Sequence, residues 1–181
     1  MANFDSNNYS DNAKQRILAV GGIHIFESQT PCQLVRAEPE GALKDLAWVD
    51  TLALEATSEG DAEVTCGSER IPLKMVTPAR LEITLSDEGN PTNIPVNEPF
   101  KVQARLYDNQ GRELEVGKFT NFEWTPSEIL KVANDPSAGE FGFCDTCFGM
   151  HGFRAIKPGK GLIAARLGSL EGNLTIETKP S

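Results

Sequence analysis

Apolar and polar residues alternate along much of the second half of the chain. The clearest run extends from Phe100 to Leu106, where every second residue is apolar and Lys, Gln and Arg lie between them. Similar alternation occurs in residues 81–85, 122–124 and 162–167. Successive side chains of a strand point to opposite faces of a sheet, so the pattern predicts strands with one buried and one solvated face.

The first half carries shorter apolar or alternating runs between residues 17 and 76, separated by turn residues such as Gly21-Gly22 and Gly67-Ser68. No 3.6-residue periodicity there is long enough for a core helix. The competing segment is 41–49, where apolar residues at i, i+3 and i+4 predict a single helical turn. The chain is therefore predicted to be all-β, with antiparallel sheets.

The stretch from Met75 to Leu85 is the expected junction between two domains, because Pro78 lacks the N–H that would continue a strand. A length of 181 residues suits two domains. The predicted organisation is a flexible polar N-terminal tail over 1–14, a divergent β domain over 15–77 and a second domain over 78–181. So short a connection is expected to hold the domains semi-rigidly, end to end.

The net charge of −9 argues against a nucleic-acid partner, since phosphate binding depends on clustered Lys and Arg. No run reaches the roughly 18 apolar residues of a membrane span, and the polar N-terminus has no apolar signal region. Two interpretations remain: a cytosolic protein, or one exported after removal of a signal segment, with a lipid or signal anchor upstream. Four cysteines favour an extracellular, cell-surface or periplasmic location if they pair.

Several motifs follow one another in a fixed order between Ala79 and Lys179. They are Val96-Asn97-Glu98, Tyr107-Asp108-Asn109-Gln110-Gly111, Trp124, Val132 and Pro158-Gly159. In this order they resemble the bacterial immunoglobulin-like domain, group 2. The first half resembles a divergent copy that lacks the family's W-x-S-S segment, and Trp48 is expected to take over that packing role.

The resemblance implies a fold of two tandem immunoglobulin-like antiparallel β-sandwiches. It also implies a non-enzymatic surface or periplasmic module, structural or adhesive, that binds a protein or glycan partner and needs no cofactor. Open edge strands would in addition allow a homo-oligomer through sheet edges. Fold alone does not determine function, so these statements are expectations.

Cys32 and Cys66 lie near the starts of a central and a closing strand, which are neighbours across such a sandwich. A disulfide between them would close a loop of roughly 34 residues and contribute about 4 kcal/mol. The alternative is two buried thiols in a reducing compartment.

A Cys-, Phe- and Gly-rich insertion at about 139–153 interrupts the strand pattern. Its Cys144 and Cys147 form a C-x-x-C motif, which is expected either to pair as a local disulfide or, with His151, to bind zinc or copper(I). Haem attachment would require His directly after the second cysteine, where Phe148 stands. The alternative function is therefore a metal- or redox-handling protein that uses the CDTCFGMH segment.

Large apolar side chains crowd the same insertion and either pack on themselves or form a contact patch. The predicted partner-binding loop comprises Phe141, Phe143, Phe148, Met150 and Phe153. No catalytic residues are expected, because the serines lie in predicted turns and neither histidine has a nucleophile at a recognisable spacing. The DNQG run at 108–111 is interpreted as a hairpin turn rather than a calcium site.

Overall fold

The computed structural model describes residues 15–86, 89–133 and 147–180. Within these ranges every regular element is a β-strand, apart from a 3₁₀ turn at Cys147–Gly149. The prediction of an all-β chain is therefore confirmed. None of the described residues form a helix with the length and apolar character that crossing a membrane requires. The predicted tail, 1–14, lies outside the described ranges.

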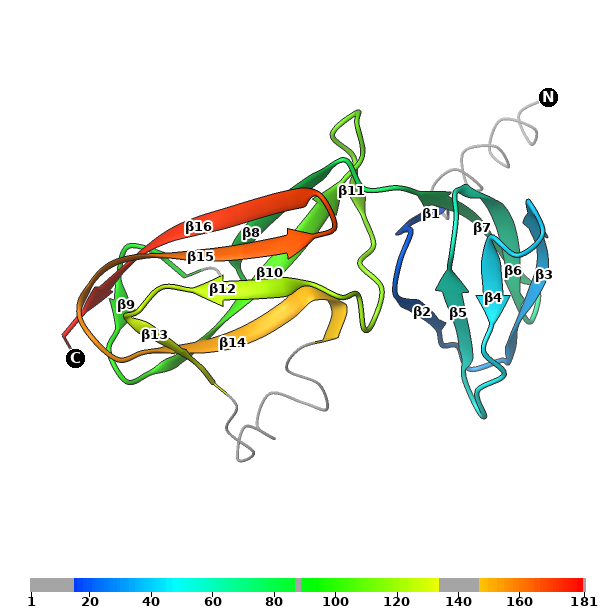
Figure 1. The fold of residues 1–181 in the computed structure, drawn as a ribbon. Helices are drawn as coiled ribbons and strands as arrows, with labels where there is room; N and C mark the ends of the chain where they lie inside the picture. The colour runs from blue at the N-terminus through cyan, green and yellow to red at the C-terminus, as the bar shows by residue number, and fades with distance from the viewer. Residues whose placement is uncertain (1–14, 87–88, 134–146, 181) are drawn as a thin grey trace, which may run out of the picture.

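The first seven strands form two facing sheets (Figure 1). They are β1 (Arg16–Ala19), β2 (Ile23–Phe26), β3 (Cys32–Glu38), β4 (Leu43–Asp45), β5 (Leu52–Ala56), β6 (Gly60–Cys66) and β7 (Glu69–Val76). One sheet has the order β1-β7-β6-β3 and the other β2-β5-β4. β1 runs parallel to β7, whereas the other pairings in these two sheets are antiparallel. We call this unit the first sandwich.

The remaining strands form the second sandwich. They are β8 (Arg80–Leu85), β9 (Ile94–Pro95), β10 (Pro99–Tyr107), β11 (Glu113–Leu114), β12 (Glu123–Pro126), β13 (Leu130–Val132), β14 (Met150–Ala155), β15 (Gly159–Leu167) and β16 (Leu170–Lys179). One sheet has the order β11-β10-β14-β13, with β8 also paired to β10, and the other β12-β15-β16-β9. β9 runs parallel to the end of β16.

Both strand orders match the immunoglobulin sandwich, in which strands A, B, E and D form one sheet and C, F and G the other. In the second sandwich β8, β10, β14 and β13 take the places of A, B, E and D, and β12, β15 and β16 those of C, F and G. In the first, β2, β5 and β4 correspond to B, E and D, and β3, β6 and β7 to C, F and G. The predicted tandem immunoglobulin-like sandwiches are therefore present.

Each sandwich has its own apolar core. Leu18, Leu54, Val64, Leu73 and Met75 are among the most buried residues of the first core. Val102, Ala104, Leu106, Phe153, Ile163 and Ile176 are completely buried in the second. The alternation in β10 thus directs its apolar residues inward, as predicted.

The predicted helical turn at 41–49 is wrong. Leu43–Asp45 instead forms β4, because Leu43 is buried and the strand pairs with β5. The chain then turns as the Asp45 carboxylate accepts a hydrogen bond from the Ala47 N–H at 2.8 Å. Trp48 follows and is 40% exposed, so it does not replace the family's core tryptophan.

Candidate functional site

The end of the predicted insertion, residues 150–153, belongs to the sandwich framework. β14 begins at Met150 and pairs with β10 on one side and β13 on the other. Phe153 is completely buried, with its ring centroid 6.2 Å from that of Phe100 and 6.0 Å from that of Trp124. The prediction that Phe153 contributes to a partner-binding loop is therefore wrong, because the pairing of β14 turns its side chain into the core.

Phe148, by contrast, is presented to solvent directly before β14. It is 38% exposed, and its backbone is left-handed, with φ 58°. Its carbonyl accepts a 2.8 Å hydrogen bond from the Gln103 amide, which ties the segment to β10. Gly149 follows with φ 80°, and a Cβ there would lie 2.9 Å from the Ala104 carbonyl oxygen. The backbone therefore approaches β10 too closely for any residue but glycine.

His151, the proposed imidazole ligand, lies half-buried against aromatic rings. Its ring stacks on Phe153 with centroids 4.6 Å apart, and the Trp124 ring lies 5.3 Å away. Nδ1 is 3.0 Å from the Gly152 carbonyl oxygen. Burial lowers the pKa of His151 and outweighs the opposing effect of that hydrogen bond, so the neutral form of the imidazole is favoured.

The other predicted residues of this segment are not placed. Phe141, Phe143 and Cys144 lie outside the described residues, as does the side chain of Cys147. The Cys144–Cys147 disulfide and the metal site therefore both stay predictions.

Cys32 and Cys66 are joined by a disulfide. The two cysteines are opposite one another in the antiparallel pair β3–β6. The bridge therefore lies within one sheet and does not cross between sheets, and it holds together the ends of two strands at the edge of the first core.

Besides the predicted connection at 75–85, a second contact, which the sequence did not reveal, joins the two sandwiches; we call this contact the junction. The segment after β11 lies along β1 and β2 and exchanges backbone hydrogen bonds with them. The Glu115 N–H donates to Ile17 O at 2.8 Å, and the Ala19 N–H donates to Glu115 O at 2.9 Å. Ile23 and Lys118 exchange two more hydrogen bonds, each of 2.7 Å. The second sandwich thus extends the strand pairing of the first.

Two glycines allow this close approach. A Cβ on Gly117 would lie 2.8 Å from the backbone of Gly22, and a Cβ on Gly22 would lie 2.3 Å from Thr120 Oγ1. A side-chain contact adds to the junction: the Arg16 guanidinium donates two hydrogen bonds, of 2.7 and 2.8 Å, to the Glu115 carboxylate. A lone glycine between Val116 and Lys118 is the sequence signal that could have indicated a close backbone approach.

Apolar packing continues across the junction. Ala19 of β1 is 1% exposed and packs in the core of the second sandwich, and Ile17 and Val76 pack against that core. His24 is buried beside it, with Nε2 3.0 Å from Ala19 O. Burial lowers the pKa of His24 more than the Ala19 hydrogen bond and the Glu115 charge raise it.

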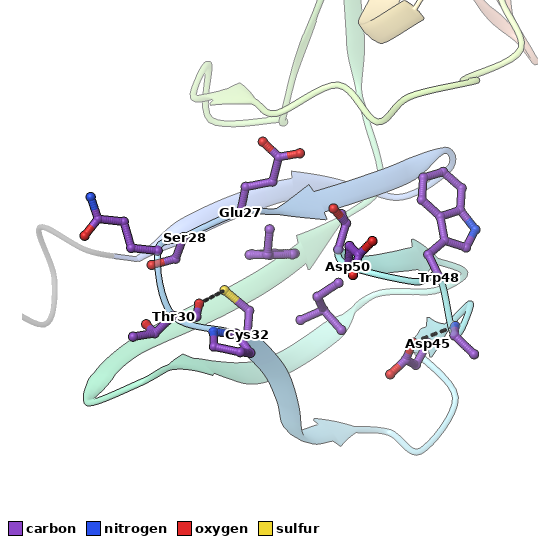
Figure 2. Close-up of a pocket in the computed structure, with 13 residues that line it drawn as sticks. Glu27, Ser28, Thr30, Cys32, Asp45, Trp48 and Asp50 are labelled. Atoms are coloured by element: carbon purple, nitrogen blue, oxygen red, sulfur yellow. Dashed lines mark hydrogen bonds between the residues drawn. The ribbon is translucent and has the colours of Figure 1, made fainter.

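A hollow of about 860 Å³ opens at one end of the first sandwich, between the loops at 27–31 and 46–51 (Figure 2). Its lining is mostly polar, and Figure 2 shows Trp48 and Asp50 on one side and Ser28 and Thr30 on the other.

The DNQG run forms the predicted hairpin turn between β10 and β11. Asp108 is buried, and its carboxylate accepts hydrogen bonds from the N–H groups of Gln110 and Arg112 and from Arg112 Nε, at 2.7 to 2.9 Å. Burial raises the pKa of Asp108, but these hydrogen bonds and the Arg112 charge outweigh it and hold the pKa below its ordinary value. The Asp108 carboxylate thus stabilises the turn by accepting its hydrogen bonds.

No protein-family model matches the chain, and no curated protein does. Domains 5–6 of the S-layer protein SbsC align over 93% of this chain and 94% of their own, with 14% identity and a TM-score of 0.39. Invasin, a bacterial integrin-binding protein, aligns over 91% and 34%, with 14% identity and a TM-score of 0.40. A β-glycosidase from Bacteroides vulgatus aligns over 87% and 25%, with 12% identity and a TM-score of 0.41. Likeness at this level assigns neither a family nor an activity.

Proposed function

We propose that this chain is a non-enzymatic module of the bacterial cell surface or periplasm, structural or adhesive, whose two sandwiches act as one rigid unit. We assign the second sandwich, 78–181, to the bacterial immunoglobulin-like group 2 domains because its motifs follow one another in that family's order. The first sandwich, 15–77, is a divergent copy. The module positions a binding surface around Phe148 for a protein or glycan partner.

The junction is the observation that carries this proposal. Domains of one chain are expected to move relative to one another unless their interface is extensive and apolar. Here the backbone hydrogen bonds of Glu115 and Lys118 to the first sandwich are combined with apolar packing of Ala19 in the second core. Breaking the junction would expose those backbone groups and that apolar surface together.

The disulfide between Cys32 and Cys66 supports the proposed compartment. Disulfides form and persist in oxidising environments such as the periplasm and the cell exterior. A fixed spacing between two sandwiches is also the property that a structural or adhesive module needs in order to hold a binding surface in a defined orientation.

The proposal is tested by measuring NMR residual dipolar couplings for the intact chain. We expect one alignment tensor to fit both sandwiches of the native protein. In the Gly117→Ala variant the added methyl group collides with Gly22 and Ile23, and we expect two tensors and faster independent tumbling.

Gly152→Ala is the matched control. Its Cβ would lie 3.5 Å from the Ala133 carbonyl oxygen, an ordinary contact, so one tensor should persist. Two different tensors in the native protein would refute the proposed rigid unit. Retention of a single tensor in Gly117→Ala would show that the glycine contact is not what holds the junction.

A further inference from the structure

We propose that the hollow of the first sandwich and the junction beside it form a binding site for a neutral oligosaccharide. Its aromatic platform is made of Trp48 from the first sandwich and Phe119 from the second. The site therefore rests on the proposed rigid unit, because the two rings keep their spacing only while the junction is closed.

The two rings are exposed, and the same ammonium group lies near both of them. Trp48 is 40% exposed and Phe119 60% exposed. Lys118 Nζ lies 5.9 Å from the centroid of the Trp48 ring and 5.2 Å from that of the Phe119 ring. Grouped apolar exposure of this kind is typical of interaction surfaces.

The backbone around both rings adopts a conformation that is unfavourable for the residues present. Ala47 and Asp50, which flank the Trp48 loop, have φ 56° and 69°, and Phe119 itself has φ 63°. Left-handed backbone is uncommon outside glycine because a Cβ makes it sterically unfavourable. Such backbone strain is concentrated in functional sites, and here it occurs at Phe119 and on both sides of Trp48.

The polar groups of the hollow determine the chemistry of the ligand. Glu27, Asp45, Asp50 and Thr51 are among its lining residues, and the Asp45 carboxylate also accepts a hydrogen bond from the Ala47 N–H. The carboxylates disfavour an anionic ligand, and the Lys118 ammonium near both rings repels a cation from the ring faces. A sugar is neutral. Its hydroxyl groups donate hydrogen bonds to carboxylates and accept hydrogen bonds from an ammonium, and its C–H face packs on an aromatic ring. The hollow has the volume usual for such ligands.

The test is an NMR titration of the full chain with cellotriose, maltotriose and chitotriose. We expect at least one trisaccharide to shift the Trp48 indole N–H and the Phe119 amide signals saturably. Trp48→Ala and Phe119→Ala should each weaken that binding at least about tenfold, a difference of roughly 1.4 kcal/mol. The matched control is Leu162→Ala, at a residue 42% exposed on β15, which should leave binding unchanged.

Absence of shifts with every trisaccharide would overturn the inference and leave the proposed function standing if one alignment tensor fits the chain. Undiminished binding in Trp48→Ala would also overturn it, and so would a lysine-rich peptide that shifts these signals when no trisaccharide does. The Gly117→Ala variant tests whether both sandwiches contribute to the site. If its sandwiches move independently and it still binds the trisaccharide, the aromatic platform of Trp48 and Phe119 would be overturned.

Discussion

Phe148 and Phe153 are five positions apart and of the same residue type, yet their environments are opposite. Phe153 is completely buried in the second core, whereas Phe148 is 38% exposed on a left-handed backbone. Composition alone does not distinguish them, because the difference arises from the pairing of β14 with β10 and β13. A count of aromatic residues therefore predicted a loop that extends to residue 153, where residues 150–153 are already strand.

Substitution of these two residues separates their roles. Phe153→Ala should destabilise the second sandwich by about 3–5 kcal/mol, because it leaves a cavity in a close-packed core. Phe148→Ala should change its stability by no more than about 0.5 kcal/mol, as surface substitutions usually do. Urea unfolding followed by Trp124 fluorescence measures both. Equal losses in the two variants would contradict the assignment of Phe148 to the surface.

Asp108 gives the second sandwich a pH-dependent contribution. Its folded pKa is lowered by Arg112 and Gln110 despite burial, so its stabilising effect is complete above the ordinary carboxyl pKa of about 4. The effect is lost as the pH falls through the lowered folded pKa. Asp108→Asn should therefore reduce the melting temperature at pH 7, and the deficit should shrink below pH 4.

An exposed carboxylate in the other sheet of the second sandwich serves as the control for that measurement. Glu123→Gln lies on β12, is exposed, and should leave the melting temperature nearly unchanged. A deficit for Asp108→Asn that stays constant down to low pH would show that the side-chain shape, not its charge, stabilises the turn.

At the scale of elements, sequence patterns predicted the strands well and the contacts between the sandwiches poorly. Alternation in β8, β10 and β15 is visible because burial selects apolar side chains at every second position. The junction around Glu115 and Lys118 is made by backbone groups and glycines, which leave no hydrophobic pattern. The hollow beside Trp48 is equally hidden from the sequence pattern, since it is lined by two separate loops with no apolar periodicity.

The disulfide between β3 and β6 should stabilise the first sandwich alone. Cys32→Ser combined with Cys66→Ser should lower its stability by about 2–4 kcal/mol, since the bridge restricts the unfolded chain. The two tryptophans report separately, Trp48 on the first sandwich and Trp124 on the second. Trp124→Phe and Trp48→Phe backgrounds therefore resolve the two unfolding transitions. An equal shift of both would show that the sandwiches unfold as one cooperative unit.

At the scale of the whole molecule, the chain is two immunoglobulin-like sandwiches arranged one after the other (Figure 1). We propose that the backbone-paired junction turns this arrangement into one unit, with a binding surface around Phe148 on the second sandwich and the Trp48 hollow on the first. The fold class follows from the order of strands and turns, whereas the orientation of the two units follows from the junction.

The parallel pairing of β1 with β7 has a consequence for a chain that is pulled from its ends. The chain enters the first sandwich through β1 and leaves it through β7, which are hydrogen-bonded neighbours over four residue pairs. Traction on the two ends shears these bonds together instead of opening them one at a time. β1 is also bridged to Glu115, so the first strand to carry the load is held from both sides. β9 and β16 form a similar parallel pair in the second sandwich, but over only two residue pairs. The first sandwich therefore has more hydrogen-bonded residue pairs to resist shear.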